Sequence, residues 1–189
     1  WAHYQYGGLQ YSSNGGSSFC PAINGIAGFD RVNWNAPHVQ DPTDPDVRYF
    51  GTNKLYRNSG NTSWTAISPD LTGGPHQDQP GQVTGTLTTI AVSPLDGDVL
   101  LTGSDDGRVY VTSSGGTFWN PRDTGLPERW ITSVRGDPFV RETLYVTVSG
   151  FRWDEPLPHV FRSTDLGLSW EPIAGNLPEA PVNDLLAHP

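Results

Sequence analysis

Adjacent acidic residues in an aromatic segment are the first candidates for chemistry in this 189-residue chain. Asp154 and Glu155 follow Phe151 to Trp153, and Asp30 or Asp184 could face them from elsewhere in the chain. Two carboxyl groups held roughly 5 to 10 Å apart across a sugar ring hydrolyse glycosidic bonds. Adjacent acids on a loop are, alternatively, a solvated surface feature. The pattern alone leaves both interpretations open.

Tryptophan and arginine side chains predict a second kind of chemistry, which is ligand binding without catalysis. Sugars present C–H faces that stack on aromatic rings, while their hydroxyl groups bond to Asn, Thr and Arg side chains. The residues that we expect to form such a platform for a glycan or peptide are Trp34, Trp130, Trp153, Arg129, Arg152 and Asn183. The alternative is that each tryptophan packs between structural units, as large aromatic residues commonly do.

Composition and charge exclude several other functions. The net charge is −9, from 20 acidic and 11 basic residues, so a nucleic-acid partner is not expected. No segment approaches the roughly 18 consecutive apolar residues of a membrane helix, so we expect no membrane insertion. The five histidines lack metal-site spacing. The acid-rich segments Asp41 to Asp46 and Asp105 to Gly107 fit hairpin turns better than calcium loops. We expect neither a metal nor another cofactor.

The elements that must position these residues are short strands joined by a repeated turn. Ser163, Asp165, Gly167 and Trp170 place a hydroxyl, an acid, a glycine and an aromatic at fixed offsets. The segment Asn58 to Trp64 is similar but one residue shorter. The same offsets recur at Ser12, Asn14, Gly16 and Phe19 and at Thr112, Ser114, Gly116 and Trp119. The acid can accept backbone N–H bonds, the glycine can adopt a positive φ and the aromatic can cover the turn, so we interpret the motif as structural.

Four strand-like segments rich in β-branched and aromatic residues accompany each turn. Units of four antiparallel strands repeated about every 45 residues indicate an all-β protein, a β-propeller with about four blades' worth of strands. The boundaries that we expect are 1–28 for the later strands of one blade, 29–75, 82–127 and 128–178 for three blades, and 179–189 for the first strand of the next or closing blade.

The two ends of the chain allow two interpretations. Val182 to Pro189 has the pattern of a first strand, and Tyr4 to Phe19 has the pattern of the later strands of a blade. Pairing of the two would close a small ring. We favour the other interpretation, that the chain is a fragment of a larger propeller. Additional blades or self-association would then complete the ring.

The turn motifs resemble Asp-box, or BNR, repeats, which occur in sialidases, in sortilin-like receptors and in two-propeller glycoside hydrolases acting on xyloglucan. The segments that are similar to large secreted bacterial proteins with sortilin-like propellers are Asn33 to Pro37, Tyr49 to Arg57, Trp64 to Thr72 and Pro158 to Ser163. The resemblance implies a secreted or cell-surface bacterial protein. The chain departs from the motif where Asn14, Ser59 and Ser114 replace the acid.

Sialidase activity, as this resemblance implies it, requires an arginine triad and a tyrosine nucleophile. Arg31, Arg129 and Arg152 are candidates for the triad, and Tyr49 or Tyr145 for the nucleophile, but the Arg-Ile-Pro motif is missing. A fold alone does not carry an activity. We therefore expect a non-catalytic binding or scaffold module that holds a glycan or peptide at the mouth of the propeller channel. The alternative is a glycoside hydrolase, sialidase-like or xyloglucanase-like, or a fragment of one.

Overall fold

The protein is built almost entirely of antiparallel β-sheets, as seen in a computed structural model that describes residues 1–60, 62–75 and 84–187. One sheet has three strands and three sheets have four strands. The predicted all-β architecture of four-stranded antiparallel blades is confirmed. The only helical elements in the described residues are two single 3-10 turns, η1 (Gln5–Gly7) and η2 (Phe151–Trp153), so no helix there has the length needed to cross a bilayer.

The strands follow one another in chain order within every sheet. The first sheet contains β1 (Ala2–Tyr4), β2 (Gly8–Tyr11) and β3 (Cys20–Pro21). The second contains β4 (His38–Gln40), β5 (Val47–Gly51), β6 (Leu55–Ser59) and β7 (Thr65–Ala66). The third contains β8 (Leu87–Ser93), β9 (Asp96–Ser104), β10 (Val109–Thr112) and β11 (Asn120–Pro121). The fourth contains β12 (Trp130–Gly136), β13 (Leu144–Ser149), β14 (His159–Ser163) and β15 (Glu171–Pro172).

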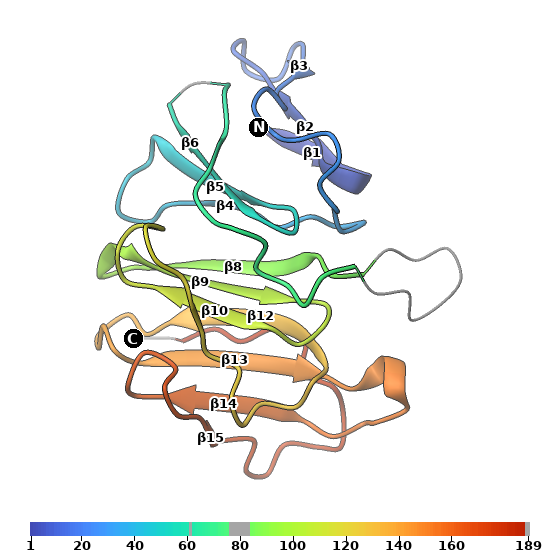
Figure 1. Ribbon diagram of the computed structural model, residues 1–189, viewed down its shortest axis with the longest axis vertical. Helices are drawn as coiled ribbons and strands as arrows, with labels where there is room; N and C mark the ends of the chain where they lie inside the picture. The colour runs from blue at the N-terminus through green and yellow to red at the C-terminus, as the bar shows by residue number, and fades with distance from the viewer. Residues whose placement is uncertain (61, 76–83, 188–189) are drawn as a thin grey trace.

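The sheets are arranged as an open arc. They follow one another along the long axis of the molecule, with β1 to β3 at one end and β13 to β15 at the other (Figure 1). The first strands β4, β8 and β12 lie toward a common side, with β8 in contact with both of the others. A closed ring formed by the C-terminal segment and the N-terminal strands is not present in the described residues.

The C-terminal segment lies along β12. Thr132 Oγ1 donates to the Val182 carbonyl at 2.7 Å, and Arg135 Nε donates to the Leu185 carbonyl at 3.2 Å. Residues 182–187 form no regular strand, although the sequence predicts a strand from residue 182 to residue 189, whose last two positions lie outside the described residues. The segment contacts β12 through side-chain donors and forms no backbone ladder with it among the described residues.

The hydrophobic core lies between the sheets and follows strand alternation. On β9, Val99 and Leu101 face a cluster shared with the fourth sheet, whereas Leu100 faces a cluster shared with the second sheet. Successive side chains of a strand point to opposite faces, so β9 is buried on both sides. A third cluster joins the first sheet to the second through Leu9, Phe50 and other residues. Each blade is therefore stabilised by its neighbours.

Three tryptophans of the turn segments fasten each sheet to the preceding one. Their indole Nε1–H groups donate to backbone carbonyls that lie one residue after the last strand of the preceding sheet. The three bonds are Trp64 to Ala22 at 2.8 Å, Trp119 to Ile67 at 2.9 Å and Trp170 to Arg122 at 2.6 Å. The sequence predicts that the aromatic covers its own turn, and the bond to the previous blade is an additional role that the spacing does not reveal.

The turns repeat one hydrogen-bonding pattern even where the acid is replaced. In the fourth sheet, Gly167 N–H donates to Ser163 Oγ at 2.8 Å and Ser169 N–H donates to Asp165 Oδ1 at 2.9 Å. The equivalent acceptors in the other two turns are Ser12 and Asn14, and Thr112 and Ser114. The glycines at the third position have φ values of +89° (Gly16), +96° (Gly116) and +82° (Gly167), a region that favours glycine. Asn and Ser keep an acceptor oxygen in place, so the turn tolerates them.

Candidate functional site

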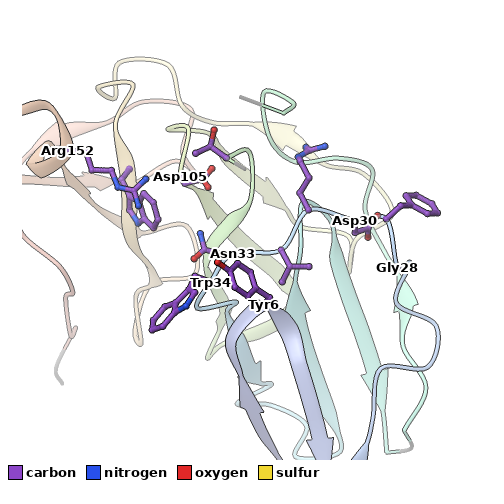
Figure 2. A pocket seen from close by; sticks show the side chains of 12 residues that line it. Tyr6, Gly28, Asp30, Asn33, Trp34, Asp105 and Arg152 are labelled. Carbon is purple, nitrogen blue, oxygen red and sulfur yellow. The ribbon is translucent and has the colours of Figure 1, made fainter. Parts of the chain in front are cut away.

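A large cavity opens on the side of the molecule where the chain enters β4, β8 and β12. Its volume is about 800 Å³. The residues that line it are Tyr6, Gly28, Phe29, Asp30, Arg31, Val32, Asn33, Trp34, Thr84, Asp105, Trp130 and Arg152. Figure 2 shows Arg152 and Asp30 at opposite sides, with Trp34, Asn33 and Tyr6 between them. We call this region the mouth.

A second cavity of about 490 Å³ adjoins the first, because Trp130 and Arg152 line both. Its other lining residues are Thr132, Ser149, Phe151, Pro181 and Asn183. Trp130 is the first residue of β12, and Arg152 lies in η2, the loop between β13 and β14. One strand end and one loop of the fourth sheet therefore form the wall between the two cavities.

The structure brings four predicted binding residues together and separates two from them. Trp34 lines the first cavity, Asn183 lines the second, and Trp130 and Arg152 line both. Trp34 has 60% of its surface exposed, so it does not pack between sheets. Arg129 and Trp153 line neither cavity and contact each other instead, with the Arg129 guanidinium 5.1 Å from the Trp153 ring centroid.

Arg129 and Arg152, which both lie over tryptophan rings, differ in charge balance. Arg129 Nε donates to Glu155 Oε2 at 3.1 Å, and Glu155 Oε1 also lies 2.8 Å from His159 Nε2. Arg152 lies over the Trp130 ring at 4.1 Å and, among the described residues, makes no hydrogen bond or ion pair. The charge of Arg129 is therefore compensated inside the protein, whereas the charge of Arg152 faces the cavities.

The predicted catalytic acids Asp154 and Glu155 lie beside the mouth and do not line either cavity. Asp154 is exposed and ends η2 in a left-handed conformation, with φ of +53°. Hydrogen bonds from His159 and Arg129 lower the pKa of Glu155, which keeps this carboxylate ionised. Asp184 accepts from Ser133 Oγ and also from Arg135. The structure gives no pairing of these acids across a shared cavity.

Two other acids line the first cavity. Asp30 accepts from Tyr56 Oη at 2.5 Å and from Lys54 Nζ at 3.0 Å. Asp105 is buried, and burial raises its pKa although hydrogen bonds from Thr86 and Gly85 act in the opposite direction. The sequence pattern around Asp105 indicates a hairpin turn rather than a calcium loop and predicts no role in a ligand site. The feature that suggests a function for Asp105 is its burial at a cavity wall, and the spacing of residues in the sequence does not reveal this burial.

The residues considered for a sialidase-like site come together only in part: Arg31 and Arg152 line the first cavity, whereas Arg129, Tyr49 and Tyr145 do not. Arg31 donates to Asp70, Thr72 and the Gly85 carbonyl, so it ties loops together. Tyr49 Oη donates to Asp41, and burial together with that charge raises the tyrosine pKa to about 12, which disfavours a nucleophilic phenolate. Tyr145 makes the equivalent bond to Asp137. Within the described part of the chain, no cluster of His, Cys, Asp and Glu could hold a metal ion.

Three exposed aromatic residues at the mouth are absent from the sequence-based candidates. They are Tyr6 and Phe29 in the first cavity and Phe151 in the second, with exposed fractions of 69%, 85% and 77%. Each lies next to glycine in the sequence, at Tyr6-Gly7, Gly28-Phe29 and Gly150-Phe151. An aromatic residue beside a glycine is therefore a sequence signal for such exposed positions.

Comparisons with solved structures give the same fold in glycoside hydrolases. A GH74 xyloglucanase from Xanthomonas campestris has a TM-score of 0.66 and 21% identity over 92% of this chain and 28% of its own. The GH74 enzyme of Niastella koreensis has a TM-score of 0.65 and 17% identity over 90% of this chain and 27% of its own. YCF48 from Cyanidioschyzon merolae has a TM-score of 0.51 and 11% identity over 72% of this chain and 35% of its own.

These neighbours are β-propeller proteins, and the likeness identifies the fold of this chain. The chain spans about a quarter of the length of the GH74 structures. No model of a known protein family matches the sequence, and no curated relative is found. Sequence identities below 25% to these structures establish the fold of this chain and do not establish its activity.

Proposed function

We propose that this chain is a binding section of a β-propeller that holds a glycan at the mouth without catalysing its cleavage. The observation that carries the proposal is the gathering of Trp34, Trp130 and Arg152 around one cavity. Exposed aromatic rings give flat surfaces on which sugar C–H faces stack, and a guanidinium supplies directed donors for hydroxyl oxygens. A peptide is the other ligand class that such a surface accepts.

The mouth favours a glycan because its aromatic residues come from three different sheets. Tyr6 follows β1, Trp34 precedes β4 and Trp130 begins β12. Rings contributed by different blades offer several separate stacking positions along a cavity of about 800 Å³. A chain of sugar units can use such stacking positions in turn.

Binding to a set of neutral plant and bacterial polysaccharides, measured by affinity electrophoresis and calorimetry, tests the proposal. We expect Trp34→Ala to weaken binding about tenfold, since loss of one stacking aromatic costs on the order of 1 kcal/mol or more. Phe118→Ala is the matched control, because Phe118 is also largely exposed but lies in the outer turn after β10. Unchanged binding in Trp34→Ala and in the double variant Trp130→Ala, Trp153→Ala would overturn the proposal.

Glycoside hydrolysis is the second candidate, and Asp105 is the observation that favours it. A buried carboxyl with a raised pKa in a ligand cavity has the property of a general acid. A second carboxylate is needed, and Asp30, the other acid of this cavity, is held by Tyr56 and Lys54. Release of reducing sugar ends by the wild-type protein, and its loss in Asp105→Asn with retained polysaccharide binding, would establish hydrolysis and exclude the non-catalytic role.

We also propose that further blades complete the ring and that the protein acts outside the cell. The open arc and the partial coverage of the GH74 structures support additional blades, supplied by a longer chain or by a second copy. The resemblance to secreted repeat proteins supports the location. Light scattering of the purified 189-residue chain tests self-association, since a mass of 20.6 kDa at all concentrations would exclude a second copy.

A further inference from the structure

The Arg152 guanidinium is held in a fixed place with its charge uncompensated. The Arg152 guanidinium carbon lies over the Trp130 ring, 4.1 Å from the ring centroid, and this cation–π contact uses none of its N–H donors as a hydrogen bond to an oxygen. No acceptor among the described residues takes these donors. A planar cation with free edge donors is matched best by a planar anion that accepts two parallel hydrogen bonds, which is a carboxylate.

The second cavity provides the surroundings that such an anion needs. No carboxylate lines it in the described part of the chain, although acids outnumber bases in the protein by 20 to 11. The nearby Glu155 is paired with Arg129 and hydrogen-bonded to His159, so its charge is already engaged within the protein. An anion would be repelled by much of this protein's surface, but among the described residues that line this cavity the one charged side chain, Arg152, is positive.

Polar and apolar groups of the second cavity complete a site for a sugar ring. Ser149 Oγ accepts the Phe151 N–H at 3.3 Å, which leaves the serine hydroxyl proton for a ligand. The Asn183 amide is exposed and lies beside the same cavity. Phe151 and Trp130 contribute aromatic surface. Together they offer donors for an anion and hydroxyl groups, and an apolar wall for C–H bonds.

We propose that the second cavity is a subsite for the carboxylate of a uronate residue in an acidic polysaccharide. This inference rests on the proposed glycan function and names the class of glycan. A single guanidinium matches the single charge of one uronate carboxylate. A neutral sugar chain would leave the charge of Arg152 uncompensated, so the site discriminates in favour of the acidic polymer.

Polygalacturonate and glucuronate-bearing xylan, each compared with its methyl-esterified form, test the subsite. Esterification removes the charge and keeps the sugar backbone. We expect the acidic forms to bind about tenfold more tightly than their esters, as for hydrogen bonds to charged groups. This preference should shrink as the salt concentration rises. In Arg152→Gln the affinity for the acid should fall to that for the ester.

Arg48→Gln is the matched control, because Arg48 also lies over a tryptophan, Trp1, at 5.7 Å and lines neither cavity. It changes the net charge equally and should keep the preference for the acid. Thermal melting of both variants checks folding. Equal binding of acid and ester by the wild type, or Arg152-dependent binding of dextran sulfate without binding of uronates, would overturn the carboxylate subsite. Absence of binding to every neutral and acidic polysaccharide would overturn the glycan function itself.

Discussion

The outer turns and the mouth use the same residue types in opposite ways. In the turn segments, Trp64, Trp119 and Trp170 donate their indole N–H groups to the preceding blade and pack against the core. At the mouth, Trp34 is largely exposed. Trp130 lies under the Arg152 guanidinium, whose N–H donors have no acceptor in the described residues. Aromatic and arginine side chains whose donors bond within the protein indicate a structural role. Exposed rings and donors without an acceptor at the mouth indicate a ligand.

This comparison assigns stability to the outer turns and binding to the mouth. A repeat protein obtains its stability largely from contacts between neighbouring repeats, so a residue that joins two blades contributes twice, to its own blade and to the interface. A residue at the mouth can change without loss of such contacts. Each variant below is therefore measured for both properties.

Trp170→Ala should produce the largest loss of stability. The change removes a ring packed against the core cluster of the third and fourth sheets and a 2.6 Å bond to the Arg122 carbonyl. We expect unfolding in urea to show a loss of about 3 kcal/mol. Trp170→Phe keeps the ring without the N–H and should lose about 1 kcal/mol. A small loss in Trp170→Ala would mean that the turns do not hold the blades together.

The second largest effect should come from low pH, which should weaken the interface between the first and second sheets. His38 lies among Trp1, Phe50 and Trp64, and its buried Nε2 has no hydrogen-bond partner in the described residues. Burial first, and then the charges of His3, Arg48 and the N-terminal amine, lower its pKa from 6.5 to about 4.

Between these two pKa values the unfolded chain takes up a proton that the folded chain excludes. Stability therefore falls as the pH is lowered from about 6.5 to about 4, by about 2 kcal/mol after allowance for partial solvent contact of the ring. Urea unfolding at a series of pH values measures this loss. His38→Phe should flatten the dependence in this window, and an unchanged slope in that variant would exclude His38 as its source.

Asp165→Asn should have a smaller effect, since Asn14 fills the equivalent position in the first turn. Hydrogen bonds from Ser169 and Ser163 lower the Asp165 pKa to about 2. The stability that this carboxylate contributes is present above its ordinary pKa of 3.8 and is lost as the pH falls toward 2. The variant should therefore lose little near pH 7 and should remove this acid dependence. A larger loss than for Trp170→Ala would reverse the ranking within the turn.

The fold could be predicted because its signals are local. Gly16, Gly116 and Gly167 mark turns that need a positive φ, and strand alternation identifies which residues are buried. The site was predicted in part, since Trp34, Trp130, Arg152 and Asn183 come together. The compensation of Arg129 by Glu155 could not be foreseen, because the residues are 26 positions apart and meet only through the η2 loop.

Trp34→Ala is the variant that most directly separates the two regions, because we expect it to have the smallest effect on stability. The side chain is 60% exposed and belongs to none of the core clusters of described residues, so the free energy of unfolding should change by no more than about 0.5 kcal/mol. Glycan binding should fall about tenfold in the same preparation. If stability fell as much as in Trp170→Ala, Trp34 would be a packing residue, and the exposed aromatic surface of the mouth would need no ligand to explain it.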